Sequence, residues 1–217
     1  MILVVAGCHT AGTPQPDRAT SACLKLGGTV GSDDLCDIHD TTTKYTIAMR
    51  FPTGYPDQDA VADYLAQERK DFIDWVQNYG RTRTLPAGLD VIGKAYESDT
   101  TRSLILSIGS DTGVHPVTTF KAFNYSLATQ SPLTFDTLFK PDSDPVAVLK
   151  PFVTQQALAR DINAGKAVDN LTADRYQQFA ITEDAIIFFF NQDTVLPHEQ
   201  GPLQVTVPRK EIAAILN

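Results

Sequence analysis

Apolar and polar residues alternate along several segments of the chain, which is the pattern of strands with one buried face. The first segment, "KYTIAMRFP" at 44–52, is rich in β-branched and aromatic residues and ends at a proline. Three more follow at 89–98, 101–110 and 117–128, each bounded by turn residues. We therefore expect one strand, and later in the chain a meander of three strands.

Two other segments have helical spacing. The first helix is expected to begin after Asp57, because aspartate is a favoured N-cap, and to end at Gly80. Its apolar stripe consists of Val61, Leu65, Phe72, Val76 and Tyr79. A second helix is predicted over 143–163, entered through Asp144 and a proline in the first turn.

The last third of the chain predicts more strands. A hairpin is expected around 182–184, a strand over 202–208, and a short closing helix from Arg209. Residues 186–190 are apolar on both faces, which indicates a central strand. Strands and helices follow one another without a regular βαβ alternation. The pattern therefore predicts one α+β domain with an antiparallel or mixed sheet and two main helices.

Composition and charge narrow the class of protein. The chain has 217 residues, of which 42% are hydrophobic and 20% charged, and its formal net charge is −8. This is a globular composition, and it lacks the clustered Lys and Arg that nucleic-acid binding requires. Beyond the N-terminus the longest apolar run is 185–190, far below the roughly 20 residues of a spanning helix. The sequence predicts no nucleic-acid partner and no membrane-spanning segment.

The N-terminus has a pattern of its own. Val5-Ala6-Gly7-Cys8 fits the bacterial lipobox, in which the cysteine is lipidated and becomes the first residue of the mature protein. Residues 1–7 are then the remnant of a signal peptide that lacks its basic start, and 8–22 are the lipidated cysteine and a flexible tether. We expect the membrane to be reached through this anchor only. The alternative is a short N-terminal strand with a buried thiol at Cys8.

The other two cysteines, Cys23 and Cys36, bracket the stretch "CLKLGGTVGSDDLC". Export favours a disulfide between them, because disulfides persist outside the cytosol. Closing a loop of about 14 residues is expected to stabilise the fold by about 3 kcal/mol. The pair is too isolated for a closed zinc site, which needs four ligands.

The stretch Gly109-Ser110-Asp111-Thr112-Gly113 contains a candidate catalytic serine. It departs from the G-x-S-x-G nucleophile elbow, because the serine stands one place early and the segment leads into a strand. A different geometry uses Ser110 as nucleophile, His115 as base and Asp111 as acid. The simpler interpretation is a loop with turn glycines, a capping serine and a structural histidine.

Other titratable clusters indicate surface turns. The run Asp33, Asp34, Asp37 and Asp40, with His39 inside it, lacks the ligand spacing of an EF-hand and favours a solvated turn. His198-Glu199 also favours an exposed turn. HExxH, P-loop and dinucleotide-binding motifs are absent from the sequence. We therefore predict no metal site and no cofactor.

Four longer motifs point to a family: "YPDQDAV", "HPVTTFKAFNYSLATQSPLTFDTLF", "FAITEDAIIFFFN" and "GPLQVTVPR". Together they resemble the mycobacterial secreted immunogenic-antigen family of MPT/MPB-type antigens, from about Cys23 to the C-terminus and including the cysteine pair. The half after about Leu104 is similar to the wider RsiV-type extracellular domain. Its last turn departs from that pattern at 197–201.

The resemblance implies export, a conserved α+β fold with a twisted antiparallel sheet, and a binding role in RsiV-type members. Some relatives are catalogued as esterases. With the lipobox, it predicts a secreted domain over 23–217 in a lipid-anchored envelope protein, acting as a non-catalytic binding module for an envelope or host partner. The alternative is a cell-surface serine carboxylesterase for short-chain acyl esters, using Ser110, Asp111 and His115.

Overall fold

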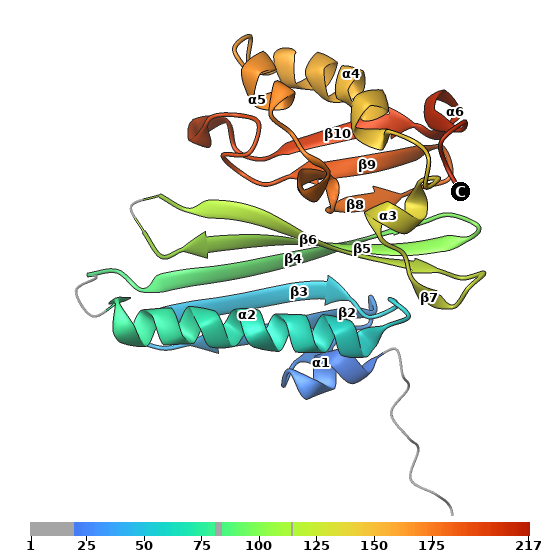
Figure 1. Ribbon diagram of the computed structural model, residues 1–217. Coiled ribbons are helices and arrows are strands. Elements are labelled where there is room, and N and C mark those ends of the chain that lie inside the picture. Colours follow the sequence, from blue (N-terminus) through green and yellow to red (C-terminus); the bar gives the residue numbers. More distant parts are fainter. Residues whose placement is uncertain (1–19, 81–83, 114) are drawn as a thin grey trace, which may run out of the picture.

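The computed structural model describes residues 20–80, 84–113 and 115–217. Within them the chain forms a seven-stranded sheet, with strands in the order β1 to β7, and a three-stranded sheet in the order β10-β9-β8. The two sheets lie one above the other, each covered by helices on its outer side (Figure 1). Cys8, the predicted signal remnant 1–7 and most of the predicted tether lie outside the described residues.

The large sheet contains all the strands expected before residue 130. Its strands are β1 (Thr29–Val30), β2 (Leu35–Thr41), β3 (Tyr45–Pro52), β4 (Ala87–Glu97), β5 (Thr101–Asp111), β6 (Val117–Ser126) and β7 (Ser131–Pro132). Of its pairs, β3 with β4 is parallel and the others are antiparallel. The parallel pair follows from the connection, since parallel neighbours need a crossover, usually a helix. Here that crossover contains α2 (Gln58–Asn78).

Helix α2 packs on one face of this sheet. It begins where predicted, because the Asp57 carboxylate accepts a hydrogen bond from the Ala60 N–H at 3.1 Å. Its predicted apolar stripe packs against the sheet, apart from Tyr79, which lies beyond the helix and is exposed. A short helix, α1 (Ser21–Lys25), packs beside α2 with Ala22 and Cys23 fully buried. The first described helix therefore begins at Ser21, two residues before Cys23.

The small sheet contains β8 (Phe179–Ile181), β9 (Ala185–Phe190) and β10 (Leu203–Pro208), with β9 in the centre as predicted. Its outer face is covered by α4 (Pro145–Leu158) and α5 (Gly165–Asp169), which lie on the side away from the large sheet (Figure 1). Around them lie α3 (Phe135–Leu138), α6 (Arg209–Ile212) and two 3₁₀ helices, Ala173–Tyr176 and His198–Gln200. As predicted, the Asp144 side chain caps α4, by accepting from the Ala147 N–H at 3.1 Å.

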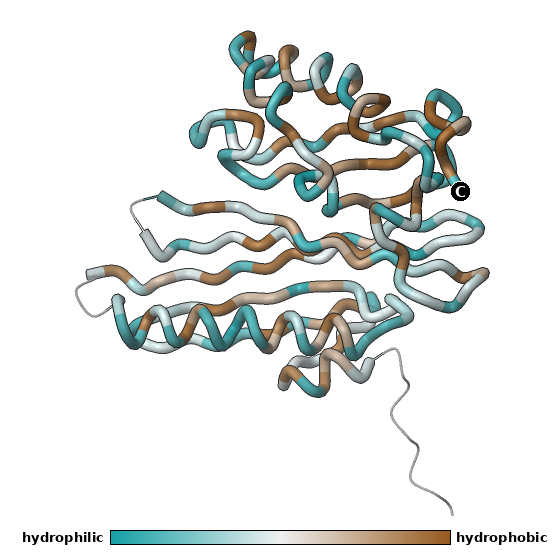
Figure 2. The backbone as a smooth tube through the Cα atoms, in the orientation of Figure 1, coloured by the Kyte–Doolittle hydropathy of each residue, from teal (hydrophilic) through white to brown (hydrophobic). Residues whose placement is uncertain are grey.

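Strand β9 is apolar on both faces because each face packs on a different layer, and Figure 2 shows it as an apolar segment. Ile186, Phe188 and Phe190 lie in the core beneath α4. Ile187 and Phe189 point the other way and form a small core with Ile105 of β5 and Ala180 of β8. This small core joins the two sheets. The alternation predicted for β5 is confirmed, since Leu104, Leu106 and Ile108 face α2 instead.

Amide side chains attach the small sheet to the edge of the large one. Gln192, Asn191 and Gln178 accept hydrogen bonds from the backbone N–H groups of Thr118, Phe120 and Ala122 of β6, at 2.8, 2.8 and 2.7 Å. These N–H groups lie along the part of β6 that β7 does not reach. The edge of β6 is therefore not open to pairing with another chain.

The predicted fold class is confirmed, since the chain forms one α+β domain with mainly antiparallel strand pairing. The structure adds a second sheet of three strands, because β8 and β9 cover the face of β5 and β6 that points away from α2. One prediction needs correction. The solvated turn predicted for the acidic run is wrong for Asp37, His39 and Asp40, which lie in β2 and pair with β3. The strand accommodates the two carboxylates because each is paired with an arginine. Arg50 Nε lies 3.7 Å from Asp37 Oδ1, and Arg69 Nη2 lies 2.6 Å from Asp40 Oδ2.

Candidate functional site

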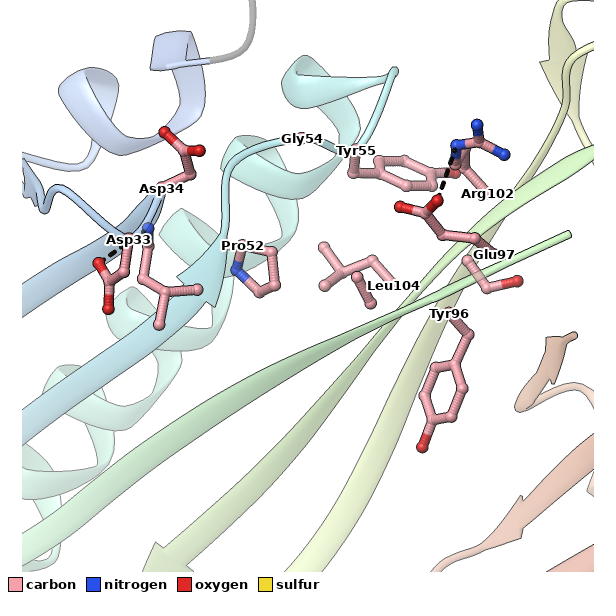
Figure 3. A pocket seen from close by; sticks show the side chains of 12 residues that line it. Asp33, Asp34, Pro52, Gly54, Tyr55, Tyr96, Glu97, Arg102 and Leu104 are labelled. Carbon is pink, nitrogen blue, oxygen red and sulfur yellow. Dashed lines mark hydrogen bonds and ion pairs between the residues drawn. The ribbon is translucent and has the colours of Figure 1, made fainter.

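A cavity of about 200 Å³ lies at one end of the large sheet. Three segments form it: the turn between β1 and β2, the end of β3 with the residues that follow, and the β4–β5 hairpin. The close-up view shows these side chains around the space (Figure 3). The cavity is lined by Asp33, Asp34, Leu35, Pro52, Gly54, Tyr55, Ala95, Tyr96, Glu97, Arg102, Ser103 and Leu104.

The walls combine apolar surface with a fixed cation. Leu35, Pro52 and Leu104 supply aliphatic surface, and the ring of Tyr55 lies beside Glu97 and Arg102 (Figure 3). Two backbone hydrogen bonds fix the Arg102 side chain, because its Nη1 donates to the carbonyls of Ser98 at 2.7 Å and Thr101 at 2.9 Å. Its Nε lies 3.8 Å from Glu97 Oε2.

Acidic side chains dominate the rim, with Asp33, Asp34 and Glu97 against the single cation Arg102 among the lining residues. Asp34 adopts a left-handed backbone, with φ of 58°, and its carbonyl accepts from the N–H and the hydroxyl of Thr53. Desolvation alone raises the pKa of Asp33, but hydrogen bonds from the Leu35 N–H and the Arg50 guanidinium outweigh it and lower this pKa below its usual value. Asp33 is paired with Arg50, with Nη2 2.7 Å from Oδ2, and Glu97 is paired with Arg102, so Asp34 is the rim carboxylate for which the described residues show no ion pair.

Ser110 and Asp111 lie at the end of β5, with side chains on opposite faces of the sheet. Ser110 pairs with Leu89 and Val117 and shares the face of Leu106 and Ile108, which is the face that α2 covers. None of the described residues forms a hydrogen bond with the Ser110 hydroxyl. The strand therefore does not direct Ser110 and Asp111 toward a common site.

His115 lies in the hairpin between β5 and β6 and meets a histidine distant in the sequence. Its ring and the ring of His198 have centroids 5.4 Å apart. The Nδ1 of His198 lies 2.9 Å from Asp193 Oδ2. The structure thus brings His115 to a histidine–aspartate pair. The turn predicted at 198–199 is a three-residue 3₁₀ helix, in which Glu199 is exposed and the His198 side chain is 29% exposed.

Sequence reasoning did not find the pair of Asp193 and His198. They lie five positions apart in the sequence, and such a spacing is not a specific signal for a catalytic pair. His115 and His198 are 83 positions apart, so their contact depends on how the two sheets pack. In the sequence alone, only the presence of a histidine in each of two loops was visible.

The structure confirms the predicted disulfide between Cys23 and Cys36, with Cα atoms 5.5 Å apart. It links α1 to β2, and both cysteines belong to the core between α2 and the large sheet. In the part of the chain that the structure describes, no group of three or more His, Cys, Asp or Glu side chains is arranged to hold a metal ion. Among the same residues, no helix combines the length and the apolar character that a membrane crossing requires.

Known proteins resemble this chain over almost its whole length. It is 40% identical over 218 residues to the Mycobacterium tuberculosis protein named Esterase Rv3036c. This alignment covers 97% of this chain and 92% of the relative. It is 34% identical to Immunogenic protein MPB64 of Mycobacterium bovis and to Immunogenic protein MPT64 of Mycobacterium tuberculosis, over 99% of this chain and 95% of theirs. The chain belongs to this family of mycobacterial secreted immunogenic antigens.

A second comparison places part of the chain in a wider group. Residues 136–210 match the family model described as a protein of unknown function, DUF3298. Crystal structures of DUF3298 proteins from Pseudomonas aeruginosa and Bacteroides fragilis share the fold, with TM-scores of 0.61 and 0.55 at 12% and 14% identity. The Pseudomonas aeruginosa structure matches 84% of this chain over 94% of its own chain, and the Bacteroides fragilis structure matches 85% of this chain over 93% of its own chain. The matched segment includes Asp193 and His198, whereas the acidic cavity precedes it.

Proposed function

We propose that this family member is an exported, lipid-anchored domain that binds a protein partner without catalysis. The observation that carries the proposal is the cavity at the end of the large sheet, with its aliphatic walls, its two tyrosines and its acidic rim. Export is supported by the buried disulfide, which suits an oxidising compartment, and by membership of the antigen family. Lipid anchoring is supported by Val5-Ala6-Gly7-Cys8.

The size and charge of the cavity suit one side chain of a partner. Pockets for small molecules usually have volumes of roughly 300–1,000 Å³, whereas this cavity has about 200 Å³. Protein interfaces often place one anchoring side chain of a partner in such a pocket. The acidic rim selects a cationic tip, and the aliphatic walls suit a methylene stem. We therefore expect the anchor to be a lysine or an arginine.

Peptides that differ at one position test this proposal. The full chain is titrated with peptides that are identical except for a central Lys, Arg, Leu or Glu, and Kd is measured by calorimetry. We expect the Lys and Arg peptides to bind at least about tenfold more tightly than the Glu peptide, a difference of about 1.4 kcal/mol. Ala95→Trp, which fills the cavity, should raise Kd for the cationic peptides at least about tenfold.

Matched variants show whether the cavity is responsible. Ala213→Trp places the same ring on an exposed alanine near the C-terminus, and it should leave Kd unchanged. Asp34→Asn removes a rim charge while keeping a residue type that tolerates φ of 58°. Asp142→Asn is its control at an exposed turn. Equal Kd values for all four peptides, or tight binding to Ala95→Trp, would refute the proposed binding site.

The lipid anchor has its own test. In a host that exports and processes the chain behind a complete signal peptide, the product should partition into detergent, because two or more acyl chains give stable anchoring. Cys8→Ala should move most of the protein into the aqueous phase. Identical partitioning of the two proteins would show that Cys8 carries no lipid.

A second candidate function is hydrolysis of short-chain acyl esters at the cell surface. It is favoured by the relative named Esterase Rv3036c and by the hydrogen-bonded pair of His198 and Asp193. The full chain should then turn over p-nitrophenyl butyrate many times per molecule. A stoichiometric burst without turnover would count against this candidate.

A further inference from the structure

The pair of His198 and Asp193 has the arrangement of a general base and the group that orients it. Asp193 Oδ2 accepts from Nδ1 of His198, so the neutral ring carries its lone pair on Nε2. No described residue hydrogen-bonds to Nε2. A carboxylate on Nδ1 fixes the tautomer and stabilises the imidazolium that forms when Nε2 takes a proton.

The surrounding loop holds both residues in place. Gln192 donates from Nε2 to the His198 carbonyl at 2.8 Å, and its Oε1 accepts from the Thr118 N–H at 2.8 Å. Asp193 adopts a left-handed backbone, with φ of 64°, inside a turn closed by the Thr194 N–H on the Asn191 carbonyl. These bonds connect the pair to the beginning of β6.

His115 covers the ring of His198 from the other sheet. The two rings are tilted by 55° with centroids 5.4 Å apart, so the imidazole of His198 is packed on one side and remains partly exposed. The contact joins the β5–β6 hairpin to the segment between β9 and β10. A base in this setting has a defined orientation and is still reached by water.

Asp193 lines a cavity of about 440 Å³, and His198 directly follows Pro197, the last residue of the cavity wall in the sequence. Asp193 lines it together with Thr194 and the apolar stretch Val195, Leu196 and Pro197, and residues around α5 form the opposite wall. Its volume lies in the range of small-molecule pockets. Val195 and Leu196 are almost fully buried, so Pro197 and Ala167 supply the apolar surface that a short acyl chain would contact, next to the residue that orients the base.

For the esterase candidate, we infer that His198 is the general base, that Asp193 is its positioning residue, and that the attacking nucleophile is water. This inference rests on the esterase candidate and deepens it. His198 Nε2 takes a proton from water while the water oxygen adds to the ester carbonyl carbon. The tetrahedral intermediate then breaks its bond to the alcohol oxygen, which receives the proton from the imidazolium. The products are the acid and the alcohol, and no serine acyl-enzyme forms.

Steady-state hydrolysis of p-nitrophenyl butyrate by the full chain tests the inference. We expect His198→Gln to lower kcat at least about a hundredfold, the scale of general-base catalysis. Asp193→Asn, which tolerates the left-handed backbone, should lower kcat about tenfold or more with KM nearly unchanged. Added imidazole should restore part of the rate of His198→Ala, which a purely structural histidine does not predict.

The control is His39→Gln, an exposed histidine of β2, because surface imidazoles hydrolyse activated esters without a site. Its rate should match the unsubstituted chain, and circular dichroism checks that each variant is folded. Absence of turnover in the unsubstituted chain would overturn the esterase candidate and this inference together. Turnover that survives His198→Gln but is lost in Ser110→Ala would overturn the inference alone and favour a serine nucleophile.

Discussion

Phe189→Ala should lower the free energy of unfolding by about 3–5 kcal/mol, the usual range for removing a buried aromatic ring. Phe189 is 4% exposed and points from β9 toward the large sheet. Its ring lies 5.2 Å from Phe120 and 6.0 Å from Tyr96. Because few side chains form this core between the sheets, the neighbours have little apolar surface with which to fill the space that the ring leaves.

Urea unfolding followed by circular dichroism measures this loss, and Phe188→Ala is the matched control. Phe188 is the preceding residue of β9 and is fully buried in the core beneath α4. We expect a loss of similar size from the control, but only Phe189→Ala should shift the ring resonances of His115 and His198, because it alone loosens the contact between the sheets. A loss below about 1 kcal/mol for Phe189→Ala would show that the small core does not join the sheets.

The elements that sequence patterns predict well are those whose own residues determine which face is buried. Strands β3 to β6 alternate, and α2 has both a cap at Asp57 and a helical stripe, so each was predictable. The alternation in β5 does not say what covers Ser103 and Ile105. The second sheet was therefore not predicted, although its strands were.

Strand β2 was missed although its pattern is regular. Cys36 and Ile38 are buried and alternate with Asp37 and His39, as expected for a strand with one solvated face. The density of acidic residues favoured a turn instead. Acidic residues are depleted in strands, and the cross-strand cation at Arg50 that compensates them is 13 residues away from Asp37 in the sequence.

Sequence patterns could not predict the two candidate sites, because each site brings together residues that are far apart in the sequence. The acidic cavity takes its walls from three separate segments, and the His198 pair acquires its neighbour His115 only through packing of the sheets. Local patterns place Ser110, Asp111 and His115 close together in the sequence. The pleat of β5 then separates the first two, and the hairpin directs His115 toward His198.

Loss of the disulfide should lower the free energy of unfolding by about 3 kcal/mol, the value of the chain-entropy model for a loop of about 14 residues. Both sulfurs are fully buried, and Gly28 packs so closely that an added Cβ would lie 2.7 Å from Cys36 Sγ. The measurement compares guanidinium unfolding of the chain and of its Cys23→Ala/Cys36→Ala variant, with and without reductant. Reductant should destabilise the first protein and leave the variant unchanged.

The same variant shows whether the disulfide stabilises the whole domain or only its N-terminal elements. Cys23 lies in α1, the first described element, so the bridge ties the beginning of the domain to β2. If its effect is on the whole unfolded chain, hydrogen exchange should accelerate throughout the core, including β5. If exchange accelerates only in α1 and β2 while global stability falls by less than about 1 kcal/mol, the bridge instead stabilises α1 and β2 locally.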